Sequence, residues 1–185
     1  MSVNAPNDKL GWLAPNFTLK DVSGDIMSLD QLKGDNGTVI CFICNHCPYV
    51  KAIAERMSFE AKELKKISIN TIAIMSNDVN QSPDDSFEKM KIFSKQYGFN
   101  FSYLYDETQE VAKNYGAVCT PDIFGFDRLL KLMYRGRIDS RVMDSDNPKI
   151  DRELYNAMLK IKNNEAAPKE QFNSFGCSIK WKNDE

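Results

Sequence analysis

The chain has 185 residues, a length that suits one compact domain. Hydrophobic residues make up 42% of the chain, which is enough for a sizeable core. Its 24 basic residues nearly balance 26 acidic ones, so the net charge is only -2. This balance gives no electrostatic basis for binding nucleic acid or an anionic membrane surface.

The N-terminal stretch MSVNAPNDKLGWLAPNF has neither the basic region nor the apolar region of a secretory signal. No segment approaches the ~18 unbroken apolar residues that indicate a membrane span. We therefore expect a cytoplasmic protein without a membrane partner. In a reducing cytosol, paired cysteines are more often catalytic or metal-binding than structural.

Hydrophobic periodicity and turn residues predict alternating strands and helices. In chain order we expect a hairpin within 16–29, a helical turn from Ser28, a strand at 38–43, a helix at 50–64, a strand at 69–75, a helix from Ser82 to about Tyr97, a strand at 101–105, a helix at 109–115, an antiparallel pair at 122–126 and 130–134, and a helix at about 150–162.

This order predicts an α/β fold in which helices flank a central mixed sheet and an N-terminal β-hairpin extends it. The continuous apolar run from Thr38 to Ile43 does not alternate, as is typical of a central strand covered on both faces. Residues 1–185 are expected to form a single domain, with 163–185 as a C-terminal tail. The sequence carries no signal for an oligomeric state.

Three of the five cysteines and the only histidine lie in CFICNHCP, residues 41 to 48. Their C-x-x-C-x-x-C spacing suits an iron–sulfur cluster, but such runs lie in loops and Cys41 lies within the expected strand. Zinc requires four ligands, and the sequence has no second Cys/His pair. We therefore expect neither a metal nor a cofactor, and we favour a redox-active dithiol made of Cys44 and Cys47.

A C-x-x-C at the start of a helix places both sulfurs in the first turn, close enough for a disulfide. We expect Cys44 at or beside the N-cap, where unpaired backbone N–H groups and the helix dipole favour its thiolate. His46 is expected to stabilise this thiolate further. Cys47, one turn deeper, is placed to resolve a mixed disulfide.

The strand VICFI, the CNHC motif and the later VCTPD segment together resemble a thioredoxin-fold protein. The resemblance implies that Pro121 is a cis-proline opposite the dithiol and that Thr120 presents its backbone to substrate. The APNFTLKDVSGDIMSLDQLKG stretch, NHCPYVKAI and the terminal GCSIKWK resemble the redoxin (AhpC/TSA) branch, and within it a peroxiredoxin-like bacterial group.

Two departures from the relatives matter. Peroxiredoxins carry P-x-x-x-T-x-x-C, and aligning its cysteine with Cys47 puts Ile40 and Cys44 at the proline and threonine positions. Thioredoxins have a buried aspartate six residues before the nucleophile, where this chain has Thr38. The resemblance therefore implies a thiol–disulfide oxidoreductase that exchanges with protein or small-molecule thiols and an unidentified reductant or oxidant. The alternative is a thiol peroxidase that reduces hydroperoxides.

The remaining cysteines have different expected roles. Cys41 is expected in the core, where free cysteine packs like a small hydrophobic residue. Cys119 lies two residues before Pro121, on the rim where the thiols emerge, and Cys177 lies in the tail. If the tail folds back, Cys177 is placed to pair with Cys119 or to relay electrons from Cys44. The other hypothesis is that both remain free thiols.

Overall fold

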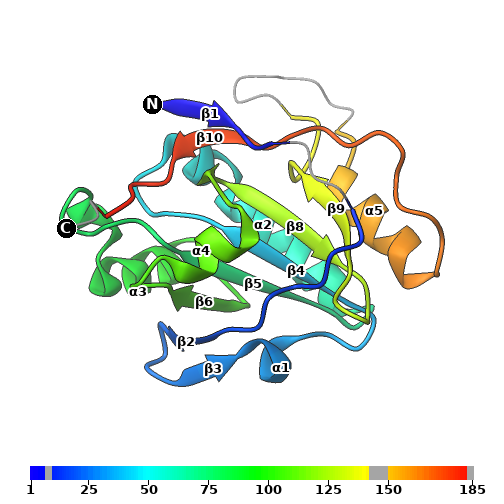
Figure 1. Cartoon of the computed structure of the whole chain (residues 1–185), viewed down its shortest axis with the longest axis horizontal. Helices are drawn as coiled ribbons and strands as arrows, with labels where there is room; N and C mark the ends of the chain where they lie inside the picture. The colour runs from blue at the N-terminus through cyan, green and yellow to red at the C-terminus, as the bar shows by residue number, and fades with distance from the viewer. Residues whose placement is uncertain (7–9, 142–149, 183–185) are drawn as a thin grey trace.

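The computed structural model describes residues 1–6, 10–141 and 150–182, and its elements are shown in Figure 1. A seven-stranded mixed sheet has the order β3-β2-β6-β5-β4-β8-β9. Its strands are β2 (Thr18–Asp21), β3 (Ile26–Ser28), β4 (Gly37–Phe42), β5 (Ile69–Met75), β6 (Ser102–Tyr105), β8 (Asp122–Phe126) and β9 (Leu132–Gly136). The expected thioredoxin-type arrangement of a mixed sheet between helices is confirmed.

The two most apolar strands lie at the centre of this sheet. All six residues of β4 are buried, and β4 pairs in parallel with β5 and antiparallel with β8. β5 pairs in parallel with β6, so the carboxyl ends of β4, β5 and β6 meet at one edge of the sheet. This edge carries the loop that follows Phe42, and it is where α/β sheets usually place their sites.

Helices cover both faces of the sheet. The long helix α2 (Pro48–Lys65) packs with α3 (Phe87–Gln96) and α5 (Glu153–Lys162) against one face. The short helices α1 (Leu29–Leu32) and α4 (Glu110–Tyr115) lie against the other face, which α4 covers in Figure 1. Among the described residues, no helix combines the length and apolar composition needed to cross a membrane.

The segment after β5 differs from its predicted structure. Pro83 begins a single 3-10 turn, η1 (Pro83–Asp85), and not the expected long helix. Ser86 is extended, with φ -57° and ψ 152°, and the α-helix starts only at Phe87. The turn brings the Asp85 side chain to the loop after β4, where it accepts backbone hydrogen bonds. These tertiary contacts override the helical preference of the Ser-Pro start.

The C-terminal tail folds back across the molecule. Its strand β10 (Phe175–Ser178) lies between β1 (Ser2–Asn4) and β7 (Cys119–Thr120) in a second, three-stranded antiparallel sheet. In Figure 1, β10 (red) runs beside β1 (blue). The register places Cys177 opposite Thr120. The tail therefore covers the loop that carries the dithiol.

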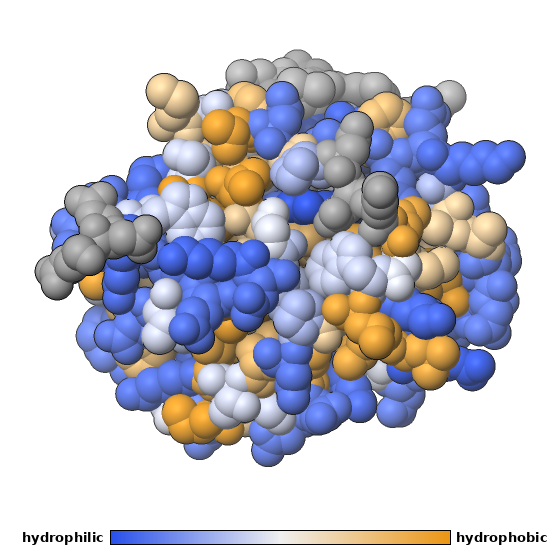
Figure 2. Space-filling view, viewed as in Figure 1, coloured by the Kyte–Doolittle hydropathy of each residue, from blue (hydrophilic) through white to orange (hydrophobic). Residues whose placement is uncertain are grey.

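The surface view in the same orientation shows mainly hydrophilic side chains, with hydrophobic residues in small groups between them (Figure 2). This distribution agrees with a nearly balanced charge of -2. Scattered apolar residues are normal on a protein surface and by themselves indicate no binding site.

Candidate active site

The dithiol lies in the loop between the central strand β4 and helix α2. The helix begins at Pro48, and its N-cap is Cys47, with φ -66° and ψ 123°. Proline suits this first helical position because its missing N–H would have no partner there and its φ is already helical. The expectation that Cys44 caps the helix is therefore wrong, because the helix begins one turn later. The helix N-terminus favours a thiolate on Cys47 instead.

Thr120 contacts both thiols of the motif. Its Oγ1 lies 3.1 Å from Cys44 Sγ, and its carbonyl oxygen lies 3.1 Å from Cys47 Sγ, which donates to it as a thiol. The peptide bond between Thr120 and Pro121 is cis, as the resemblance implied. The side chains of Cys44 and Cys47 are both fully buried. The residue before the cis-proline thus closes directly over the dithiol.

The two thiols differ in acidity because they share a hydrogen bond. The Cys44 thiol donates to Cys47, and this bond lowers the pKa of Cys47 to about 5 against the opposing effect of burial. Hydrogen bonds from the Cys177 thiol and from the backbone N–H groups of Cys177 and Val50 stabilise the same thiolate. The pKa of Cys44 is raised, first by this bond and then by burial. Cys47, and not Cys44 as expected, is the more acidic thiol.

His46 lies between the cysteines in sequence but forms its main contact with a carboxylate. Its Nδ1 lies 2.6 Å from Asp85 Oδ2, and this hydrogen bond raises the pKa of His46. Among the described contacts His46 forms no hydrogen bond to Cys44, the thiolate it was expected to stabilise, and its electrostatic interaction with Cys47 is weaker than its bond to Asp85. The ring therefore stabilises the neighbouring acid, and through it the loop.

Thr38 occupies the position of the buried aspartate of thioredoxins, but a buried acid, Asp85, reaches the dithiol loop from another part of the chain. Its side chain has no exposed surface. Oδ1 accepts the backbone N–H groups of Asn45 at 2.7 Å and His46 at 3.2 Å, and Oδ2 accepts Asn77 Nδ2 at 2.8 Å. Burial raises the pKa of Asp85, but the hydrogen bonds from His46 and Asn77 outweigh burial and leave this pKa below its ordinary value. Asp85 is therefore a charged carboxylate beside the dithiol.

Sequence reasoning missed Asp85 and Asn77 because neither belongs to the cysteine motif. Asp85 lies in η1, and Asn77 follows β5 at the same sheet edge as the dithiol. The available signal was the position of Asn77 after a buried parallel strand, since the carboxyl ends of such strands collect functional residues. From the sequence, Asp85 falls in the first turn of the helix expected from Ser82, and Asn77 falls in the loop before that helix.

Cys119 and Cys177 lie on adjacent strands but not opposite each other. Cys177 pairs with Thr120, and Ser178 pairs with Cys119. Because side chains alternate along a strand and directly opposite residues share a face, Cys177 lies on the Thr120 face and Cys119 on the other. None of the five cysteines is in a disulfide here. The geometry disfavours a Cys119–Cys177 bridge and brings Cys177 to the dithiol instead.

The two remaining cysteines are buried away from solvent. Cys41 is buried in β4, and burial raises its pKa. Cys119 is also buried, donates to the carbonyl oxygen of Pro121 at 3.6 Å, and has its pKa raised by burial. Raised pKa values keep both thiols protonated, so neither has the character of a nucleophile.

The site also contains a group of atoms with metal-ligand chemistry. Single donor atoms of Cys44, His46 and Asp85 lie within 4.8 Å of one another. However, His46 Nδ1 and the Asp85 carboxylate are already hydrogen-bonded to each other at 2.6 Å, and the carboxylate also accepts two backbone N–H groups. A bound ion would have to displace these bonds, so the group fits a hydrogen-bond network better than a metal centre.

A pocket of about 310 Å³ adjoins the dithiol loop. Its lining includes Pro121, the edge-to-face pair of Tyr49 and Phe175, and Arg56 and Arg137. The pocket places apolar surface next to the cis-proline, and its two arginines are paired with the carboxylates of Asp139 and Glu153.

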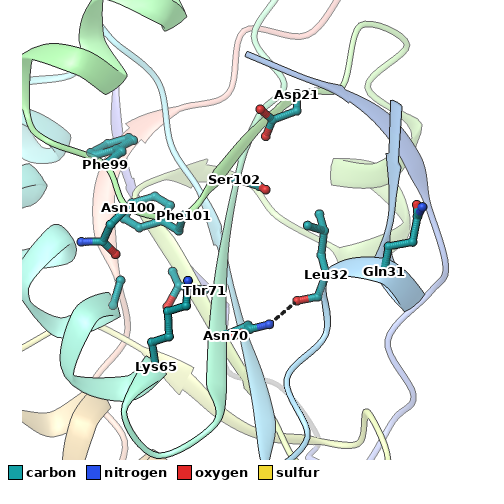
Figure 3. Close-up of a pocket in the computed structure, with 11 residues that line it drawn as sticks. Asp21, Gln31, Leu32, Lys65, Asn70, Thr71, Phe99, Asn100, Phe101 and Ser102 are labelled. Carbon is teal, nitrogen blue, oxygen red and sulfur yellow. Dashed lines mark hydrogen bonds between the residues drawn. The ribbon is translucent and has the colours of Figure 1, made fainter. Parts of the chain in front are cut away.

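A second pocket, of about 390 Å³, lies at the other end of α2, which is roughly 27 Å long at 1.5 Å per residue (Figure 3). Lys65 and Asn70 line it, and Asn70 Nδ2 donates to the carbonyl oxygen of Leu32 at 2.9 Å. It contains no cysteine or histidine, and it lies far from the thiols.

The sheet, the C-x-x-C motif at the start of α2 and the cis-proline opposite it define a thioredoxin-fold redox protein. The sequence model of the AhpC/TSA family matches residues 10–135. The chain therefore belongs to the AhpC/TSA family, the redoxin branch expected from its motifs.

Curated relatives fall into two redox classes. The chain is 32% identical over 117 residues to peroxiredoxin Q, chloroplastic, of Triticum aestivum, a match covering 62% of this chain and 48% of that protein. It is 28% identical over 120 residues to the thiol-disulfide oxidoreductase ResA of Bacillus thuringiensis subsp. konkukian, covering 65% of each. The chain spans about half the length of the peroxiredoxin relatives that it matches.

Solved structures match over the full length. An uncharacterized conserved protein from Geobacillus kaustophilus has a TM-score of 0.95 and 41% identity, covering 100% of this chain and 98% of that chain. A hypothetical protein from Sinorhizobium meliloti has a TM-score of 0.93 and 32% identity, covering 98% of this chain and 99% of that chain. The whole fold is therefore shared, including the regions outside residues 10–135.

Proposed function

We propose that the protein is a thiol–disulfide oxidoreductase that exchanges a Cys44–Cys47 disulfide with protein or small-molecule thiols. The observation that carries this proposal is the pair of hydrogen-bonded thiols beneath Thr120, one of them at the N-cap of α2. A cytoplasmic location is part of the proposal, because a reducing compartment supplies thiols and reductants for such exchange.

In the reducing direction, the Cys47 thiolate attacks one sulfur of a substrate disulfide and releases the other as a thiolate. The thiol of Cys44 then loses its proton and attacks Cys47 Sγ, which forms the Cys44–Cys47 disulfide and releases the second substrate thiolate. The Asp85 carboxylate lies within 4.8 Å of Cys44 Sγ, but its lowered pKa and its hydrogen bonds make it a poor acceptor, so the proton leaves to solvent or to the departing substrate thiolate. The oxidising direction is the same sequence reversed.

The departures from the peroxiredoxin motif support exchange over peroxide reduction. Ile40 and Cys44 occupy the positions where peroxiredoxins carry proline and threonine. A second activity nevertheless follows from the acidity of Cys47 and from the peroxiredoxin relatives. A hydroperoxide would oxidise the Cys47 thiolate to a sulfenic acid and leave as an alcohol, and Cys44 would then form the disulfide with release of water.

A matched pair of trapping variants tests the proposal. The double variant Cys44→Ser, Cys177→Ser removes both thiols that interact with Cys47, so Cys47 should hold captured substrates as mixed disulfides that a reducing agent releases. Cys47→Ser removes the nucleophile and should capture far less. Failure of both variants to form mixed disulfides with glutathione disulfide or with disulfide-bonded insulin would contradict the proposal. Rapid stoichiometric consumption of peroxide by the reduced wild type would favour the peroxidase instead.

A further inference from the structure

The strand β10 pairs along one edge of β7, the strand that carries Thr120. β7 is paired with β10 on one side, and Ile179 N donates to the carbonyl oxygen of Val118 at 3.0 Å. Thr120 contacts both Cys44 and Cys47. A chain segment that pairs with Thr120 is therefore placed over the dithiol, and here that segment belongs to the protein itself.

Gly176 allows β10 to approach this closely. A Cβ atom at this position would lie 2.0 Å from the carbonyl oxygen of Thr120 and 3.0 Å from Pro121 Cδ. Only a residue without a side chain fits against the cis-proline, so the strand is shaped for this contact. The neighbouring residue, Cys177, then lies directly opposite Thr120.

Cys177 differs from the dithiol in its exposure. Cys44 and Cys47 are fully buried, whereas Cys177 is the only cysteine with a partly exposed surface. Cys177 packs against the buried cluster that contains Cys44 and Cys47, and its thiol and backbone N–H help to lower the pKa of Cys47. A thiol from outside thus reaches Cys177 more readily than it reaches either member of the buried pair.

Hydrogen bonds on both sides of β10 hold Cys177 in this position. Before the strand, Ala5 N donates to the carbonyl oxygen of Ser174, and within it Ser178 N donates to the carbonyl oxygen of Met1, both at 2.9 Å. After the strand, Lys180 N donates at 2.9 Å to Asn77 Oδ1, and the Nδ2 atom of Asn77 bonds Asp85. The tail is therefore built into the hydrogen-bond network of the site.

We propose that Cys177 is a third redox cysteine, which exchanges with Cys47 and carries the disulfide between the buried pair and external thiols. The proposal deepens the proposed function and rests on it. It also replaces the expected Cys119–Cys177 pairing with a Cys47–Cys177 pairing.

The exchange balances in three steps. The Cys177 thiol loses its proton as its sulfur attacks Cys47 Sγ of the oxidised protein, which forms a Cys47–Cys177 disulfide, and Cys44 leaves and takes up a proton to become a thiol. An external thiolate attacks Cys177 Sγ, which forms a mixed disulfide at the surface and releases the Cys47 thiolate. A second external thiolate attacks the external sulfur of that mixed disulfide and releases Cys177. Two thiols become one disulfide, and the protein gains the two electrons.

The first experiment is disulfide mapping in the Cys44→Ser variant. After oxidation with glutathione disulfide, peptide mass spectrometry should find Cys47 joined to Cys177. Cys119→Ser combined with Cys44→Ser is the matched control and should give the same bridge, because Cys119 faces away. A bridge between Cys119 and Cys177, or glutathione retained on Cys47 with Cys177 free, would overturn the proposal.

The second experiment measures turnover in the Cys177→Ser variant. Reduction of its Cys44–Cys47 disulfide by glutathione should slow by about tenfold or more, since an intramolecular step with a high effective concentration is lost. Cys119→Ser should keep the wild-type rate. A wild-type rate in Cys177→Ser would overturn the proposal. Should the wild type form no Cys44–Cys47 disulfide, the proposed function fails, while the mapping of Cys47–Cys177 still decides whether this pair exchanges.

Discussion

At the scale of single residues, the two thiols of the motif have opposite acidities because of where α2 begins. Cys47 caps the helix and accepts hydrogen bonds from Cys44, Cys177 and the backbone of Val50. Cys44 lies one turn earlier, next to the hydroxyl group of Thr120 and near the charge of Asp85. The position at the N-cap and these contacts favour the thiolate on Cys47, which supports our proposal that the second cysteine of the C-x-x-C motif is the nucleophile.

Titration of His46 tests the acid beside the dithiol. The Asp85 carboxylate raises the pKa of His46, so their bond stabilises the fold fully below the unfolded pKa of about 6.5. That stabilisation is lost as the pH rises through the higher pKa of the folded protein. In Asp85→Asn, the pKa of His46 should fall, and the free energy of unfolding should decrease by about 1–3 kcal/mol, because the partly exposed His46 ring and the Asn45 backbone lose a charged hydrogen-bond acceptor.

The measurement is an NMR titration of the ring, which needs no assignment because His46 is the only histidine. Asp84→Asn is the matched control, because that neighbouring carboxylate is exposed and pairs with Lys89 instead. An unchanged pKa of His46 in Asp85→Asn would contradict the described network.

Sequence reasoning predicted that the dithiol, His46, Thr120 and the cis-proline are neighbours. The C-x-x-C motif places His46 between the cysteines, and the resemblance to thioredoxin-fold proteins places Thr120 and Pro121 opposite them. Sequence reasoning misassigned the thiolate because the start of a helix cannot be placed to within three residues from apolar periodicity alone. It missed Asp85 because that contact depends on how η1 packs against the loop at Asn45.

At the scale of elements, the central strands and α2 followed from continuous apolar runs and one buried stripe. The strand in the tail could not be predicted in this way, because the segment around β10 has no hydrophobic periodicity. Its partner strands β1 and β7 are only three and two residues long. Such short strands form through tertiary pairing, and their pairing leaves no pattern in the sequence. Gly176 was visible in GCSIKWK, but only the packing explains it.

Substitution of Gly176 tests the position of the tail. Gly176→Ala places a Cβ against the Thr120 carbonyl and should reduce the free energy of unfolding by about 1–3 kcal/mol through overpacking. The backbone amides of Ser178 and Ile179 donate to the carbonyl oxygens of Met1 and Val118, so both amides should lose protection from hydrogen exchange. Ser178→Ala is the control, because it leaves the backbone bonds intact. Unchanged exchange in Gly176→Ala would show that β10 does not pack on Thr120.

At the scale of the whole molecule, the mixed sheet and both helical layers follow from the alternation of elements along the chain, whereas the strand order does not. The packing of these elements places β4, η1, β7 and β10 around the sulfurs of Cys44 and Cys47. Of these elements, η1, β7 and β10 lie outside the cysteine motif. The chemistry therefore depends on long-range packing, which sets the acidity of Cys47 and the access to it.

The most direct test is the reduction potential of the Cys44–Cys47 couple as a function of pH. A thiolate on Cys47 stabilises the reduced form, so the potential at neutral pH should lie above the roughly -270 mV of thioredoxin. Because Cys47 titrates at about 5, reduction should take up one proton above this pH and two below it. The slope should therefore change from about 60 mV per pH unit below that point to about 30 mV above it.

A slope of about 60 mV per pH unit that continues to pH ~8 would mean that Cys47 is protonated in the reduced protein, and the account of the site would be wrong. The absence of any two-electron couple would contradict the dithiol itself.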